Sequence, residues 1–319
     1  MKPTISDEER AAIMANVSAY NTPSTARAVW ELAVTLVPFA LLHWFAFWPT
    51  LPLAVLLRVR AFILSHDAAH GALFPSRTAN RWTANLVMPA AAYTPASFWR
   101  STHTYHHAHA NELGAHDTPW TTAQYVASPR RARALYRLLN HPFTMLSGLL
   151  PAAMYFGIQQ WAARHWYEWA IEVIVLWLHA RRGTLAFELV SALLGAMVGM
   201  LLFNVQHSFH GVHRARREEW DSIAVALYGS SLLVLPRALA WFTAGLEYHH
   251  VHHLDTRVPC YRLRECHDAA ADSLFRNVCR VPLSAMVTVL GYSLWDEGLC
   301  KMVTPSEVEG RSSIEKTTT

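Results

Sequence analysis

Long apolar segments constrain the fold of this 319-residue chain more than any other feature of its sequence. A helix needs about 20 apolar residues to cross the hydrocarbon core of a bilayer, and four stretches approach or reach that length. They are Val29 to Trp48, Leu51 to Ser65, Phe143 to Trp161 and Leu185 to Phe203. The sequence therefore predicts an all-α integral membrane protein with about four transmembrane helices.

The segments between these helices predict how the helices are oriented. Trp48-Pro49-Thr50 is a tight turn without Lys or Arg, so the first two apolar segments form a hairpin. Basic residues flank this hairpin at both ends, which favours a cytosolic location for the ends. Residues 165–180 contain three tryptophans and are interpreted as an interfacial or extramembrane helix. An even number of spans then leaves both chain termini in the cytosol.

Composition divides the chain into an anchor and a polar part. Only 16% of the residues are charged, against about 25% in an average soluble domain. Residues 1–26 are predicted as a cytosolic segment, in which Ser6 and Glu9 match a helix capping box. Residues 27–302 form one domain that includes a cytosolic helical cap (residues 204–301), and 303–319 are expected to be a disordered tail. The net charge of +4 accompanies no nucleic-acid motif, so no nucleic-acid partner is expected.

The histidines of the chain gather in clusters near the ends of the apolar segments and in the polar regions. The clusters are His66 with His70, His103 with His106 and His107, His207, and His249 with His252 and His253. Because residues i, i+3 and i+4 of a helix share one face, each cluster presents its imidazoles together. By the same geometry, His109 and His250 point away from the faces of their clusters.

Imidazole clusters of this size predict a metal centre. One HxxxH pattern alone arises more often by chance than as a ligand pair, whereas three boxes at predicted membrane boundaries favour metal binding. A single ion uses three or four such ligands, so eight or nine histidines suit two ions. Imidazole binds iron, copper or zinc, and the residues alone do not choose among these metals. The cap is therefore predicted to hold a histidine-rich di-metal site.

The clusters and their surroundings resemble a known family. HDAAHG, WRSTHTYHHAHAN and EYHHVHH are similar, in order and separation, to the three histidine boxes of membrane fatty acid desaturases. NVQHSFHGVH, REEWDSIAVALYGSS and RECHD resemble bacterial acyl-lipid desaturases that act at the Δ5 or Δ12 position. The resemblance covers roughly Leu51 to Asp268, and it makes residues 27–302 one desaturase domain.

The resemblance implies a di-iron site and its ligands. These are His66, His70, His103, His106, His107, His207, His249, His252 and His253. It also implies that Asn204 is a water-mediated neighbour of the irons. Nearby carboxylates commonly orient ligating imidazoles, and the candidates for this role are Asp67, Asp117, Asp221 and Glu247.

The implied reaction inserts a cis double bond into a lipid-linked acyl chain. It uses O₂ at the two irons and two further electrons from an external ferredoxin-like or similar donor. The implied location is the bacterial cytoplasmic membrane, with several spans and with the active site facing the cytosol. A hydroxylase or ketolase on the same di-iron scaffold remains an alternative. A non-catalytic metal-binding or transport protein is a remote one, because a transporter would place ionisable ligands along a path through the bilayer.

Overall fold

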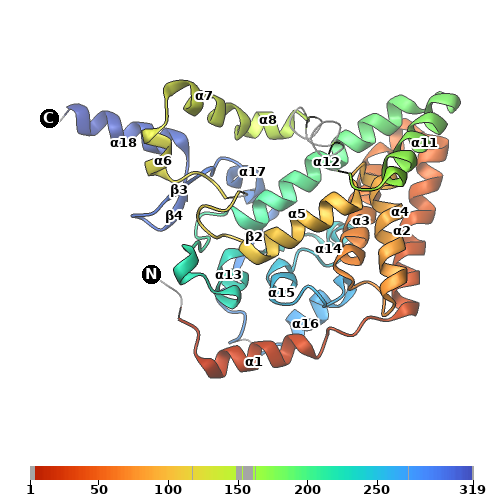
Figure 1. Ribbon diagram of the computed structural model, residues 1–319, viewed down its shortest axis with the longest axis horizontal. Coiled ribbons are helices and arrows are strands. Elements are labelled where there is room, and N and C mark those ends of the chain that lie inside the picture. Colours follow the sequence, from red (N-terminus) through yellow and green to blue (C-terminus); the bar gives the residue numbers. More distant parts are fainter. Residues whose placement is uncertain are drawn as a thin grey trace.

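The computed structural model describes residues 4–116, 118–148, 153, 161, 163–271 and 273–317, and most of these residues are helical (Figure 1). Three helical runs are long and apolar enough to cross a membrane, by length and composition. They are α2 (Thr25–Phe45), the run Trp48–His70, which joins the 3-10 turn η1 (Trp48–Thr50) to α3 (Leu51–His70), and α12 (Leu185–His207). These runs correspond to the first, second and fourth predicted spans.

The membrane hairpin consists of α2 and α3, and α3 lies at its centre. The α3 helix packs against α2, α12 and α4 (Arg77–Ala92). Ser24 begins α2, since its side chain accepts a hydrogen bond from the backbone of Arg27, and Pro49 lies in the turn before α3. Most of α3 is buried from Ala54 to Ala68, so this helix contributes its whole circumference to the interior.

The third predicted span, Phe143–Trp161, differs from what the structure describes. Helix α8 covers only Pro142–Leu146, and it is followed by Gly148 with a φ of +79°. Because a positive φ interrupts an α-helix, no continuous helix extends through Gly148. Most of the remaining predicted span lies outside the described residues.

Helix α11 (Trp166–Arg182) joins the helix bundle instead. The sequence suggests an interfacial or extramembrane helix here, but α11 packs against α4 and α12 along its length of about 25 Å. Glu168 near its start accepts hydrogen bonds from Ser97, and Arg182 at its end donates to the carbonyl oxygen of Trp44 in α2. Glu168 and Glu172 of α11 are therefore buried toward the bundle, while Trp169 and Trp177 are exposed on the outside.

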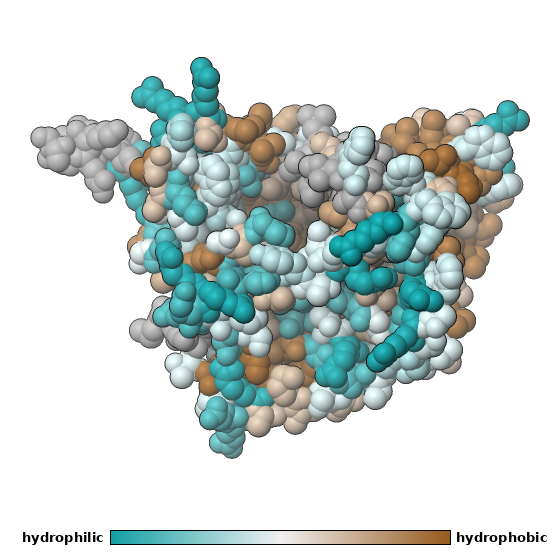
Figure 2. All heavy atoms as spheres, viewed as in Figure 1, coloured by the Kyte–Doolittle hydropathy of each residue, from teal (hydrophilic) through white to brown (hydrophobic). Residues whose placement is uncertain are grey.

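The outer surface of this bundle is apolar. Figure 2 shows hydrophobic side chains at the upper right of the molecule, over α2, α11 and the start of α12. Hydrophilic side chains predominate at the lower left, over the cap. Exposed α2 residues on this surface include Val37, Leu41 and Trp44. Such a surface is expected of a helix bundle whose outer side contacts lipid.

Short helices and turns build the polar part of the molecule. Those before α12 are α1 (Asp7–Ser18), α5 (Ala96–His109), α6 (Thr122–Ala127) and α7 (Arg130–Leu139). Those after it are η3 (Arg217–Glu219), α13 (Ser222–Gly229), α14 (Arg237–Ala240), η4 (Trp241–Thr243), α15 (His249–Leu254), η5 (Cys260–Arg262), α16 (Leu263–Ala269), η6 (Leu283–Ala285), α17 (Met286–Val289) and α18 (Pro305–Thr317). Cap helix α15 packs against α1, α13 and α16.

Two small sheets show that the all-α prediction is wrong in detail. The strands β1 (Ser231–Val234) and β2 (Cys279–Pro282) pair in parallel, and β3 (Leu294–Asp296) pairs antiparallel with β4 (Lys301–Val303). Each strand is only three or four residues long, so none shows the alternating pattern that identifies a strand in a sequence.

The two ends of the chain were predicted to carry a helix capping box and a disordered tail, respectively. The capping box of Ser6 and Glu9 is confirmed at the start of α1. The tail predicted to be disordered from residue 303 is instead ordered at its beginning, where Val303 lies in β4 and α18 follows. Glu309 of α18 accepts a hydrogen bond from Tyr125 and pairs with Arg137, so contacts with α6 and α7 hold this helix.

Candidate metal centre

Four helices bring the predicted histidine ligands to one place. The first box occupies the last turns of α3, which Gly71 closes with a φ of +80°, a conformation that glycine adopts without strain. The second box lies near the end of α5, and the third forms α15 itself. His207 is the last residue of α12. Each helix therefore contributes imidazoles at or near one of its ends.

The first of two groups contains five histidines, which lie on three different helices. They are His66, His70, His103, His107 and His252, and their ligand nitrogens all lie within 4.8 Å of one another. The Nε2 atoms of His66 and His103 are 2.7 Å apart, and His107 Nε2 lies 3.0 Å from His103 Nε2. His252 Nε2 lies 3.1 Å from His107 Nε2. The Nε2 atoms of the three boxes thus converge on one point.

The second group contains four histidines whose ligand nitrogens also lie within 4.8 Å of one another, and they are His106, His207, His249 and His253. His207 Nε2 lies at its centre, 3.2 Å from His106 Nε2 and 2.8 Å from His249 Nε2. His253 Nε2 is 3.0 Å from His249 Nε2. The two groups adjoin, since the rings of His107 and His253 have centroids 4.3 Å apart.

These nitrogen positions fit metal ions. Ligand nitrogens about 2.1 Å from one ion lie roughly 3.0–3.4 Å from each other, which is close to the separations within both groups. The buried Nε2 of His70, which belongs to the first group, has no hydrogen-bond partner among the residues that the structure describes. A buried nitrogen lone pair without a donor is unfavourable unless a cation occupies the site. The residues of both groups therefore suit metal ions chemically as well as geometrically.

Burial keeps these imidazoles neutral, which is the form that binds metal. Loss of solvation lowers the pKa well below the usual histidine value for His103, His107, His249, His252 and His253. Neighbouring imidazoles lower each pKa further, because several positive charges in one buried site repel each other. Neutral rings leave one nitrogen lone pair free in each histidine.

Contacts around the groups hold the rings in place. His207 Nδ1 donates to the backbone carbonyl of Gly229 at 3.2 Å, which directs its Nε2 toward the second group. Trp99 stacks on His103, with ring centroids 4.8 Å apart and an interplanar angle of 22°. The sequence indicated an anchor residue at Trp99 rather than a catalytic one, and it assigned no role to Gly229. The position of Trp99 one helical turn before His103 is the only signal that could have indicated this stacking.

Two histidines that helical geometry excluded from the boxes do point elsewhere. His250 is buried, and its Nε2 lies 2.9 Å from Nδ1 of His267 in α16. His109 Nδ1 lies 2.8 Å from a carboxylate oxygen of Glu112. The helical-face argument is confirmed for both residues. The His250–His267 pair was not foreseen, since no sequence pattern relates the two residues.

The polar residues expected to orient the imidazoles have other partners in the structure. Asp67 accepts a hydrogen bond from the backbone of Cys260, Asp221 caps α13 and pairs with Arg10, and Glu247 accepts from Thr243. The amide nitrogen of Asn204 donates to the carbonyl oxygen of Met200 in its own helix. Asp117 lies outside the described residues. The orienting role of these residues therefore stays a prediction.

Comparisons with known proteins agree with this geometry. The family model described as "Fatty acid desaturase" matches residues 42–278. A fatty acid desaturase of Bacillus subtilis is 29% identical over 309 residues, which cover 88% of this chain and 86% of that protein. An sn-1 oleoyl-lipid 12-desaturase of Synechocystis is 23% identical over 228 residues, covering 67% of this chain and 65% of that protein. The resemblance inferred from the histidine boxes is thereby confirmed.

Proposed function

Because the chain belongs to the fatty acid desaturase family, we propose that it inserts a cis double bond into a lipid-linked acyl chain with O₂ and two external electrons. The observation that carries this proposal is the convergence of nine imidazoles in two adjoining groups. The names of its relatives also support a lipid substrate, since they include oleoyl-lipid 12-desaturases. Membership of this family makes the chain an oxidoreductase.

Each group of histidines would hold one iron ion. The five-histidine group binds one ion and the four-histidine group the other, so the chain contributes only neutral nitrogen ligands. When bound, the iron pair supplies the O₂ chemistry that removes two hydrogens from neighbouring methylenes.

The protein contributes position and exclusion of water. Six of the nine histidines are buried, His70, His107 and His253 are half-buried, and Trp99 covers one side of His103, so the site is largely shielded from solvent. Removing a hydrogen from an unactivated methylene requires the acyl chain to be held within a fixed distance of the metal pair. The rigid attachment of each box to a helix provides that fixed geometry. An external ferredoxin-like or similar protein would deliver the two electrons.

The membrane arrangement that fits this function has four spans. We include α11 as the third span, because its two ends contact α5 and the end of α2. His70 at the end of α3 and His207 at the end of α12 then lie on one side, together with both termini. That side would be the cytosolic face of the bacterial cytoplasmic membrane, where soluble electron donors are available.

Expression in a bacterial host that lacks polyunsaturated lipids tests the function. Fatty acid methyl esters from cells with the wild-type chain should contain a new cis double bond, which gas chromatography with mass spectrometry detects. His249→Ala should abolish this product. His109→Ala is the matched control, because His109 lies beside the second box but outside both groups, and it should retain the product.

The same chromatogram separates the alternatives. Hydroxy or keto fatty acids in place of new alkenes would favour a hydroxylase or ketolase on the same scaffold. Unchanged lipids in cells whose membranes contain the metal-loaded wild-type protein would contradict an oxidoreductase acting on acyl chains and would favour a metal-binding role.

A further inference from the structure

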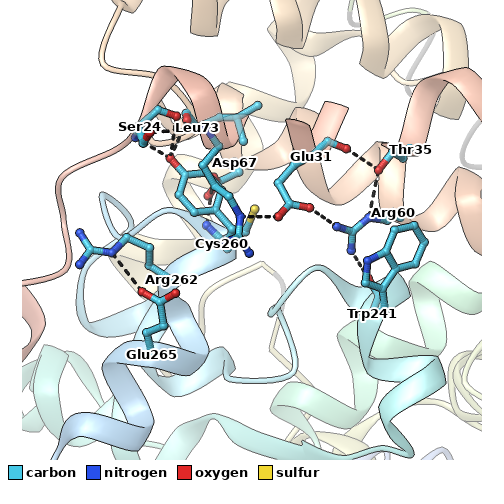
Figure 3. A network of polar contacts seen from close by, with 12 residues as sticks. Ser24, Glu31, Thr35, Arg60, Asp67, Leu73, Trp241, Cys260, Arg262 and Glu265 are labelled. Carbon is cyan, nitrogen blue, oxygen red and sulfur yellow. Dashed lines mark hydrogen bonds and ion pairs between the residues drawn. The ribbon is translucent and has the colours of Figure 1, made fainter. Parts of the chain in front are cut away.

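A pocket separate from the two histidine groups lies between the membrane hairpin and the cap. Its volume is about 390 Å³. Arg27, Trp30 and Arg60 line it from α2 and α3, while Arg237 and Arg264 line it from the cap. Figure 3 shows Arg60 between Glu31 and Trp241, where the hairpin meets the cap.

Positive charge predominates in this pocket. Four arginines line it, against the carboxylates of Glu31 and Glu247. Glu31 is shared, since it pairs with Arg27 at 2.7 Å and also with Arg60. Glu247 accepts a hydrogen bond from Thr243 within the cap. The two carboxylates therefore do not neutralise the four guanidinium groups.

Two of the arginines remain available to a ligand. Arg237 is exposed, and it forms no ion pair with any residue that the structure describes. Among the described residues, Arg264 forms an ion pair with Asp268 alone, across 3.2 Å at an exposed site, and such surface pairs contribute little free energy. Planar guanidinium groups bind phosphate oxygens through paired hydrogen bonds, more specifically than lysine does.

The surroundings of the pocket match the surface of a membrane. Trp30 near the start of α2 is 63% exposed, and Trp241 of the cap is 41% exposed. Exposed tryptophans at the end of a membrane helix are typical of the headgroup region of a bilayer. The pocket lining is also close to the third histidine box along the sequence, because Glu247 precedes His249 by two residues. A lipid headgroup held here would contact the segment that leads into the third histidine box.

We propose that this arginine-lined pocket binds the phosphate of a glycerolipid headgroup. The chemistry recognised is a phosphate ester with room for the attached glycerol. Binding at this pocket does not require the chain to desaturate the bound lipid. A binding measurement therefore tests the proposal independently of turnover.

The test is a titration of the full-length protein in detergent, followed by native mass spectrometry. The probe is dioctanoyl-phosphatidylglycerol, and dioctanoylglycerol and inorganic phosphate serve as separate probes at the same concentrations. Wild-type protein should bind the phospholipid and neither of the other two. Arg237→Gln and Arg264→Gln should each weaken phospholipid binding about tenfold, and the double variant should weaken it further.

Arg276→Gln is the matched control, because Arg276 is exposed on the cap but does not line the pocket, and it should bind like the wild type. Thermal unfolding measurements check that each variant is folded. We expect all of them to fold, because substitutions at exposed positions usually change stability little. Equal phospholipid binding by the double variant and the wild type would overturn the proposal. Equal binding of dioctanoylglycerol, or displacement of the lipid by equimolar phosphate, would also overturn it, the latter in favour of a free-phosphate site.

Discussion

Replacing His249 or His250 with alanine separates two adjacent histidines of the third box. His249 belongs to the four-histidine group, with its Nε2 2.8 Å from that of His207. His250 points away from both groups, and its Nε2 lies 2.9 Å from His267 Nδ1. His249→Ala should therefore reduce bound metal and abolish the double-bond product, whereas His250→Ala should retain both.

The cost of His250→Ala to stability follows from its surroundings. The residue is fully buried and packs against Phe275, with ring centroids 5.0 Å apart. Losing a buried hydrogen bond costs about 0.5–1.5 kcal/mol, and the cavity left by a large side chain raises the total to roughly 2–5 kcal/mol. His250→Ala should accordingly lower the unfolding temperature without removing metal. His267→Ala removes the same contact from the other side and should behave in the same way.

The assay compares variants at matched levels in membranes. Metal is measured by mass spectrometry of the purified protein, and the product by fatty acid methyl ester analysis. His250→Ala without metal or product, together with an active His249→Ala, would refute the assignment of ligands by helical face. It would require the box to adopt another backbone conformation in the active protein.

Three further predictions follow from individual contacts. Gly195→Ala should destabilise the protein by about 1–3 kcal/mol in thermal unfolding, because the new Cβ would lie 2.8 Å from Arg58 Cδ. Gly199→Ala is the control and should not destabilise it, because a Cβ at position 199 would meet no atom within 4 Å. Asp221→Ala should cost about 1 kcal/mol through loss of the α13 cap but leave metal content unchanged, and metal loss would restore its predicted role as an orienting group. A tag inserted near Gly114 should stay unlabelled on intact cells, and labelling would contradict the four-span topology.

Local geometry explains what the sequence could predict. The spacing of each histidine box determines which rings share a helical face, and this face depends only on the helix itself. For that reason the exclusion of His109 and His250 could be predicted without knowledge of the tertiary structure. The first hairpin was predictable for a similar reason, since apolar length and a short turn are properties of adjacent residues.

Contacts between distant segments could not be predicted from the sequence. Glu168 and Glu172 lower the hydropathy of α11, but both are buried against the bundle, while its tryptophans face outward. Average hydropathy cannot tell which face of a helix carries the polar residues, so the packing of α11 against the bundle was not predicted. The partner of Asp67 could not be predicted for the same reason, because Cys260 lies 193 residues away in the chain.

Metal analysis of the purified full-length protein tests the central claim most directly. If the two histidine groups each hold an iron ion, protein from iron-supplied cells should contain close to two irons per chain, as measured by inductively coupled plasma mass spectrometry. His249→Ala should contain clearly less iron, and His109→Ala should match the wild type. One zinc per chain, with no iron and no iron-dependent double-bond formation, would contradict the di-iron account.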